Sequence, residues 1–127
     1  MRRLLATTPA LLYAGLIAYA SHIPGLQPLF TWSWGDKLTH ALVYAGFGMT
    51  LAFAVTAQHQ QPSFASIAVW TLLLGALYAA SDELHQLFVP NRVADFRDWL
   101  ADVVGIGVSL LISRPLFRWW HRWLWKG

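Results

Sequence analysis

The chain has 127 residues, of which 57% are hydrophobic and only 12% are Asp, Glu, Lys or Arg. A soluble domain carries about 25% charged residues, and a chain this short has a large surface to cover. The composition therefore argues against a water-soluble globule, a disordered chain and a nucleic-acid-binding domain, and it favours an integral membrane protein. Because the chain has no cysteine, disulfides, thiolate metal sites and a cysteine nucleophile are excluded.

Charged residues, together with an uncharged polar turn at residues 58–63, divide the chain into apolar segments close to the roughly 20 residues that cross a bilayer. We predict an all-α integral membrane bundle, forming a single domain over residues 1–127. Its four transmembrane helices are expected at residues 4–22, 38–57, 64–82 and 97–116, followed by a basic and aromatic interfacial tail at 117–127. Proline, glycine and tryptophan fill the first connection, as is typical of chain at headgroup level, and Pro62 marks a polar turn in the second.

The first predicted helix has an alternative interpretation as a signal peptide. Arg2 and Arg3 precede an apolar run, and Ala18-Tyr19-Ala20 resembles a cleavage site. The same residues fit a first transmembrane helix whose small side chains pack against its neighbours. We favour the retained helix, because a short membrane chain needs it for packing.

Basic residues near the helix ends predict the orientation. One side receives Arg2, Arg3, Arg114, Arg118, Arg122 and Lys126, whereas the other receives Lys37, Arg92 and Arg97. The positive-inside rule then places both termini in the cytoplasm. We expect the protein in a cell membrane, of the bacterial inner or cytoplasmic type. In the tail the basic residues recur every four positions between tryptophans, which suits the surface of an anionic leaflet. We interpret this stripe as a topology anchor rather than a lipid-specific site.

All six acidic residues fall on the predicted outer side. They are Asp36, Asp82, Glu83, Asp95, Asp98 and Asp102. Asp36 and His40 are four residues apart and share a helix face, as do Asp98 and Asp102. Asp102 lies one helical turn, roughly 6 Å, deeper than Asp98, where an acid faces protein or a water-filled pocket rather than lipid.

Three helix ends are therefore expected to direct polar groups into one outward pocket. The candidate ligand-binding residues are Asp36, Lys37, His40, Asp82, Glu83, Gln86, Arg92, Asp98 and Asp102. Helix capping is the structural alternative for Asp36, Asp95 and Asp98, since acids at a helix N-terminus satisfy free N–H groups. Capping does not account for the two acids at the C-terminal end of the third helix or for Asp102.

Three short motifs together form a specific pattern. D-K-x-x-H begins at Asp36, D-E-x-H-Q-x-F-x-P-x-R at Asp82, and D-x-x-x-D-x-x-G at Asp98. This pattern resembles the VanZ-like family of small multi-span membrane proteins, over residues 36 to about 111. The resemblance implies a cell-envelope membrane protein associated with lowered sensitivity to teicoplanin, a glycopeptide with a lipid tail. Many members carry Asn at Asp102 and Gly at Asn91, and Asn can adopt the left-handed turn that Gly favours.

Three functions fit these residues. In the first, the pocket binds a lipid headgroup, a lipid-linked glycan or a lipoglycopeptide, and a divalent cation (Mg²⁺, Ca²⁺ or Mn²⁺) bridges the acids to a phosphate. The candidate metal ligands are Asp36, His40, Glu83, Asp98 and Asp102, while Lys37 and Arg92 could contact a phosphate directly. The expected partners are membrane lipids, with an envelope lipid or glycopeptide as ligand and no nucleic acid.

The second function is a membrane hydrolase or transferase acting on a lipid-linked phosphate or glycan. Its candidate catalytic residues are His40, Glu83 and His85, with either histidine as general acid or base. No P-loop, GxSxG or HExxH motif supports it. The third function is a packing subunit whose polar cluster only holds the helices together, aided by small residues four apart such as Gly105 and Ser109.

Overall fold

The computed structural model describes residues 2–60 and 62–125, and all the regular secondary structure in these ranges is α-helix. The helices are α1 (Arg2–His22), α2 (Gly35–Gln58), α3 (Phe64–Gln86) and α4 (Phe96–Trp125). Each is long and apolar enough to cross a membrane, which confirms the predicted all-α bundle of four transmembrane helices. All four helices are longer than predicted: α1 and α2 begin two and three residues earlier, α3 continues past residue 82 to Gln86, and α4 continues past residue 116 to Trp125.

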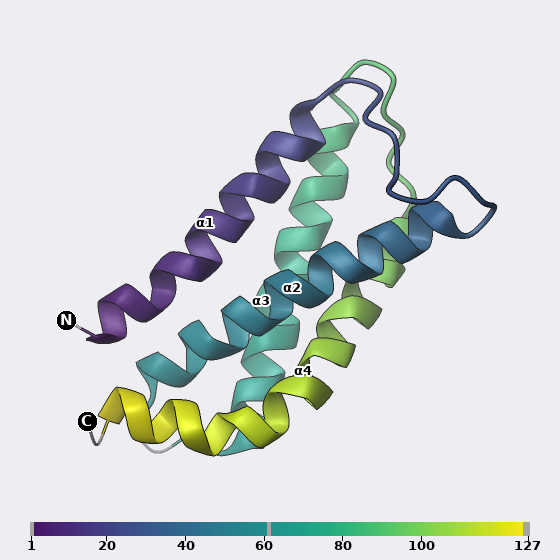
Figure 1. The fold of residues 1–127 in the computed structure, drawn as a ribbon. Helices are drawn as coiled ribbons and strands as arrows, with labels where there is room; N and C mark the ends of the chain where they lie inside the picture. Colours follow the sequence, from purple (N-terminus) through teal and green to yellow (C-terminus); the bar gives the residue numbers. More distant parts are fainter. Residues whose placement is uncertain (1, 61, 126–127) are drawn as a thin grey trace.

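The helices run up and down through the bundle (Figure 1). Both ends of the chain and the α2–α3 connection lie at one end of the molecule, at the lower left of Figure 1, and the other two connections lie at the opposite end. We call these the terminal end and the loop end. This arrangement has the sidedness predicted from the sequence, in which both termini share one face. The placement of the terminal end in the cytoplasm stays a prediction.

The burial pattern is that of a protein surrounded by lipid. Leucines and valines on all four helices are largely exposed, among them Leu11, Leu42, Leu77 and Leu111. The interior, in contrast, contains many polar side chains, and those buried at the loop end are Asp82, Glu83, Gln86, Asp98 and Asp102. Polar groups in a membrane protein normally face the bundle interior or a water-filled cavity. The bundle is therefore apolar outside and polar at one end inside.

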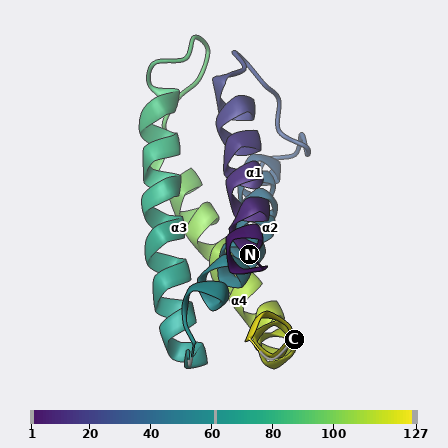
Figure 2. The same cartoon turned by 90° about the vertical axis from the view of Figure 1, so that its left-hand side faces the viewer.

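The last helix changes direction without ending. In Figures 1 and 2 the final stretch of α4, drawn in yellow, crosses beneath the terminal end of the bundle. Pro115 lies inside α4, where it removes one backbone hydrogen bond and favours a bend. We refer to residues 116–125 as the C-terminal arm. Trp120 and Leu124 of the arm are buried, and the Arg3 guanidinium lies 3.6 Å from the centre of the Trp125 ring.

The basic stripe predicted in the tail lies on this helix as far as Arg122. Arg114, Arg118 and Arg122 are exposed, and the exposed rings of Trp119 and Trp123 lie between them in sequence. Lys126 and the side chain of Arg2, which complete the predicted basic side, lie outside the described residues. An exposed basic and aromatic face suits an anionic leaflet, so the interfacial role of the tail stays a prediction.

The connection between α3 and α4 is held by specific local geometry. Asn91 has a φ of 60°, the left-handed conformation anticipated for it as a replacement of Gly. Asp95 caps α4, since its Oδ1 accepts a hydrogen bond from the Arg97 backbone N–H at 2.8 Å. The alternative capping role for Asp36 is not observed, because the residue before α2 is Trp34 and no side chain caps it. The acids at these helix ends thus differ in role.

The absence of cysteine allows a direct test of the predicted orientation. Phe88, in the α3–α4 connection, is 85% exposed, and His59, between α2 and α3, is also exposed. We expect a membrane-impermeant thiol reagent to label Phe88→Cys in intact cells and His59→Cys only after permeabilisation. The measurement is the ratio of labelling before and after permeabilisation, and the reverse pattern would place the loop end in the cytoplasm.

Candidate functional site

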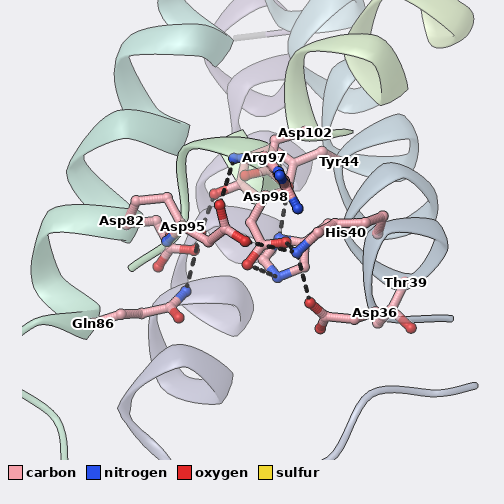
Figure 3. Close-up of polar contacts among 12 residues, drawn as sticks. Asp36, Thr39, His40, Tyr44, Asp82, Gln86, Asp95, Arg97, Asp98 and Asp102 are labelled. Atoms are coloured by element: carbon pink, nitrogen blue, oxygen red, sulfur yellow. Dashed lines mark hydrogen bonds and ion pairs between the residues drawn. The ribbon is translucent and has the colours of Figure 1, made fainter. Parts of the chain in front are cut away.

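A cluster of polar side chains lies inside the loop end of the bundle. Figure 3 shows side chains from α2, α3, α4 and the α3–α4 connection converging there. The outer part of the cluster is centred on Lys37, whose Nζ donates to Asp36 Oδ2 at 3.1 Å and to Asp95 Oδ2 at 3.2 Å and also contacts Asp98 Oδ1. A single ammonium therefore serves three carboxylates.

Asp95 belongs to this outer part and lies between α3 and α4. The Arg97 backbone N–H, and after it the Lys37 ammonium, hold the pKa of the Asp95 carboxyl below its usual range by hydrogen bonding. The carboxylate is consequently ionised at neutral pH. It therefore acts both as the cap of α4 and as one of the anions that position Lys37.

The inner part of the cluster is centred on His40. Its Nδ1 lies 2.9 Å from Asp102 Oδ1, and its Nε2 lies 3.9 Å from Asp98 Oδ2. Asp102 is fully buried at 0% exposure, in agreement with the prediction that it faces the bundle interior. Its second oxygen, Oδ2, has no hydrogen-bond partner among the residues that the structure describes.

Close packing of α2 on α4 explains why the two motifs meet. A Cβ atom built on Gly105 would overlap the carbonyl oxygen of Ala41, so only glycine allows this separation between the helices. Ala41 follows His40, and Gly105 lies one turn after Asp102. The glycine of the D-x-x-x-D-x-x-G motif thus brings the imidazole on α2 within reach of the acids on α4.

α3 supplies the third side of the cluster. The Glu83 carboxylate accepts a hydrogen bond from the Asp95 backbone N–H at 3.1 Å and a long one from Gln86 Nε2 at 3.5 Å. Asp82 Oδ2 accepts the Tyr44 hydroxyl at 3.1 Å. Tyr44 was not among the predicted site residues, although it lies four residues after His40 and continues the same helix face.

A cavity of about 110 Å³ opens beside the cluster, between α1, α2, α3 and the α1–α2 connection. Its polar lining consists of Ser21, Gln27, Asp36, Thr39, His40, Tyr44, Asp82, Gln86 and Arg92. Its apolar lining includes Ile17, Leu26 and Val43. Of the predicted ligand-binding residues, Lys37, Glu83, Asp98 and Asp102 do not line this cavity.

Two predicted site residues make contacts away from the cluster. The Arg92 guanidinium donates to the Ala20 carbonyl at 3.1 Å and the Ile23 carbonyl at 3.3 Å, so it holds the end of α1 while also lining the cavity. His85 is exposed, and its Nε2 lies 3.3 Å from Nδ1 of His22. The structure therefore does not bring His85 into the same group as His40 and Glu83.

Two sets of side chains have the composition and spacing of cation ligands. One is Asp36, His40 and Asp98, and the other is His40, Glu83 and Asp102; in each, the ligand atoms lie within 4.8 Å of one another. All five predicted metal-ligand candidates belong to one set or the other. The sets differ in charge compensation, because Lys37 contacts both acids of the first set and neither acid of the second.

These features define a class of protein: a multi-pass helical membrane protein with its buried acidic residues gathered inside one end of the bundle. The chain belongs to the VanZ/LLP1 family, since the family model of that description matches residues 5–118. This match confirms the resemblance predicted from the three motifs and extends it through α1. No curated protein and no solved structure matches the chain.

Proposed function

We propose that this chain is an envelope membrane protein whose loop end faces outward and whose cavity binds the polar headgroup of a membrane lipid or lipid-linked glycan. The observation that carries the proposal is the cavity of about 110 Å³ with a mixed lining. Polar groups such as His40 and Gln86 share it with Ile17 and Val43. A lipid headgroup with the start of its acyl chain presents the same two chemistries, and convergent polar groups within an apolar pocket are typical of ligand sites.

The size of the cavity limits the ligand. Pockets for drug-sized molecules measure about 300–1,000 Å³, so this cavity accommodates a headgroup or a single sugar and not a whole glycopeptide. The family resemblance implies a lowered teicoplanin sensitivity. That effect would then arise because the cavity binds an envelope lipid or a small part of the antibiotic. The lipid tail of either ligand would lie along the exposed apolar residues of the bundle.

The proposal is tested by filling the cavity without altering a charge. Leu26 lines the cavity, whereas Leu29 lies in the same connection, is exposed and does not line it. Mass spectrometry of lipids that copurify with the protein is expected to show one headgroup class enriched over the bulk membrane. We expect Leu26→Trp to reduce that enrichment about tenfold, equivalent to about 1.4 kcal/mol, and Leu29→Trp to retain it. Equal enrichment in both variants and the parent would overturn the proposal.

An enzyme acting on a lipid-linked phosphate or glycan is the second candidate, and one contact favours it. His40 lines the cavity and lies 2.9 Å from the buried Asp102, an arrangement in which a carboxylate orients an imidazole for general acid or base catalysis. Incubation of the purified protein with envelope lipids and Mg²⁺, Mn²⁺ or Ca²⁺, followed by mass spectrometry, distinguishes the two. Altered lipids would establish turnover, and their absence with every metal would favour binding alone.

A further inference from the structure

The inner part of the cluster has His40 as its basic side chain, but among the described residues it has no lysine or arginine partner. Lys37 is paired with Asp36, Asp95 and Asp98. Within residues 2–60 and 62–125, no lysine or arginine forms an ion pair with the remaining three acids, which are Asp82, Glu83 and Asp102. Buried carboxylates are normally paired or coordinate a metal, because an isolated ionised group inside a protein is costly.

Asp102 presents the clearest case of an incomplete environment. Its side chain is fully buried, and one oxygen faces His40 at 2.9 Å. Its other oxygen has no hydrogen-bond partner among the described residues, although buried side-chain oxygens nearly always have one. The Asp102 carboxylate lies in the same small region as ligand-type atoms of His40 and Glu83, so its unpartnered oxygen points to a bound cation.

We propose that His40, Glu83 and Asp102 bind a single Zn²⁺-class cation. One ligand atom from each lies within 4.8 Å of the others, and the three residues come from α2, α3 and α4, so the ion would join three helices. Zinc binds nitrogen and oxygen ligands at about 2.0–2.2 Å, which requires a small inward movement. Glu83 can supply it through Oε1, whose hydrogen bond from Gln86 is long at 3.5 Å, while Oε2 keeps its hydrogen bond from the Asp95 backbone N–H.

The ligand types favour Zn²⁺ over the lighter cations. Mg²⁺ and Ca²⁺ prefer all-oxygen sites, whereas one imidazole with two carboxylates suits Zn²⁺. The other set of candidate ligands shares His40, but the Lys37 ammonium already contacts both Asp36 and Asp98. A second positive charge there would be repelled by Lys37. The set containing Asp102 is therefore the one assigned.

The cation would lie behind the wall of the proposed headgroup cavity. Of its three ligands only His40 also lines that cavity, so the positive charge would offset the acids that otherwise repel a phosphate. The metal site does not depend on the proposed function: it is measured by metal content, whereas headgroup binding is measured by lipid content. If one of these two measurements is negative, the other still tests its own proposal.

The test measures zinc binding to the purified full-length protein after chelator treatment and dialysis. We expect one Zn²⁺ per chain by elemental analysis, with Mg²⁺ failing to displace it. Glu83→Gln and Asp102→Asn keep the side-chain shape and are expected to lower zinc affinity about tenfold or more in competition with a chromophoric chelator. Arg97→Gln, which changes an exposed charge at the same end of the bundle, should bind zinc as the parent does.

Three results would overturn the assignment. The first is a parent protein that retains no zinc, and the second is parental affinity in Glu83→Gln. The third is zinc loss in Asp36→Asn together with retention in Asp102→Asn, which would place the ion in the other set. If Asp102→Asn fails to accumulate, Glu83→Gln and Asp36→Asn still distinguish the two sets, since the first is expected to lose zinc and the second to retain it.

Discussion

Replacing Lys37 by methionine is expected to destabilise the bundle and to lower the amount of folded protein in the membrane. The substitution removes the ammonium that contacts Asp36, Asp95 and Asp98, while leaving the three carboxylates close together. Breaking a fully buried ion pair costs about 3–5 kcal/mol. Because Lys37 and two of its partners are partly exposed to solvent, we expect a smaller loss, about 1–3 kcal/mol.

The measurement is thermal or denaturant unfolding in a defined detergent, together with membrane abundance. Adding Asp98→Asn to Lys37→Met should recover part of the loss, because it removes the most buried of the three carboxylates and the two residues are energetically coupled. Arg97→Gln serves as the control and is expected to change stability by less than about 0.5 kcal/mol. A Lys37→Met protein as stable as the parent would show that the carboxylates do not depend on this ammonium.

The number and class of the helices could be predicted because bilayer thickness fixes the length of an apolar segment. Helix ends are less well specified by hydropathy. α3 continues through Glu83 to Gln86 and α4 continues to Trp125, because backbone hydrogen bonding does not stop where the side chains become polar. Hydropathy marks the part of a helix that faces lipid. The polar extension of α3 contributes to the bundle interior at the loop end, and the extension of α4 lies at the terminal end.

Helical periodicity predicted which site residues share a face, but it did not predict which faces meet. Asp36 with His40, and Asp98 with Asp102, follow directly from a spacing of four. The contact that joins the two pairs is the approach of Ala41 to Gly105, which depends on how two helices pack. The three partners of Lys37 are equally a product of packing, since one of them lies in the α3–α4 connection.

His85 and Arg92 illustrate the limits of the same reasoning. Successive residues of a helix are rotated by about 100°, so Asp82, Gln86 and Glu83 fall on one arc of α3, and these three are buried. His85 lies about 60° outside that arc and contacts His22 instead. Arg92 is in a connection, where no periodicity applies, and the carbonyls that it contacts belong to α1. Spacing alone gives neither the contact of His85 with His22 nor that of Arg92 with α1.

Adding a methyl group at Gly105 is expected to separate α2 from α4 and so to disrupt the site from a distance. A Cβ atom there would overlap the Ala41 carbonyl oxygen and lie 2.9 Å from its carbonyl carbon. Because these atoms are backbone, no change of rotamer relieves the overlap, and the helices must move apart. Overpacking of this kind costs about 1–3 kcal/mol. We expect Gly105→Ala to lower unfolding stability by that amount, and Gly105→Val to prevent accumulation of folded protein.

Gly107 provides a matched control on the same helix. A Cβ atom built there meets nothing within 4 Å, and alanine is favoured over glycine in a helix by up to about 1 kcal/mol. Gly107→Ala should therefore leave stability unchanged or raise it. Gly105→Ala should in addition weaken zinc binding, because His40 and Asp102 adjoin the contact between α2 and α4. If both alanine variants unfold alike and bind zinc alike, the two helices do not approach at Gly105, and the geometry that joins His40 to the acids of α4 is wrong.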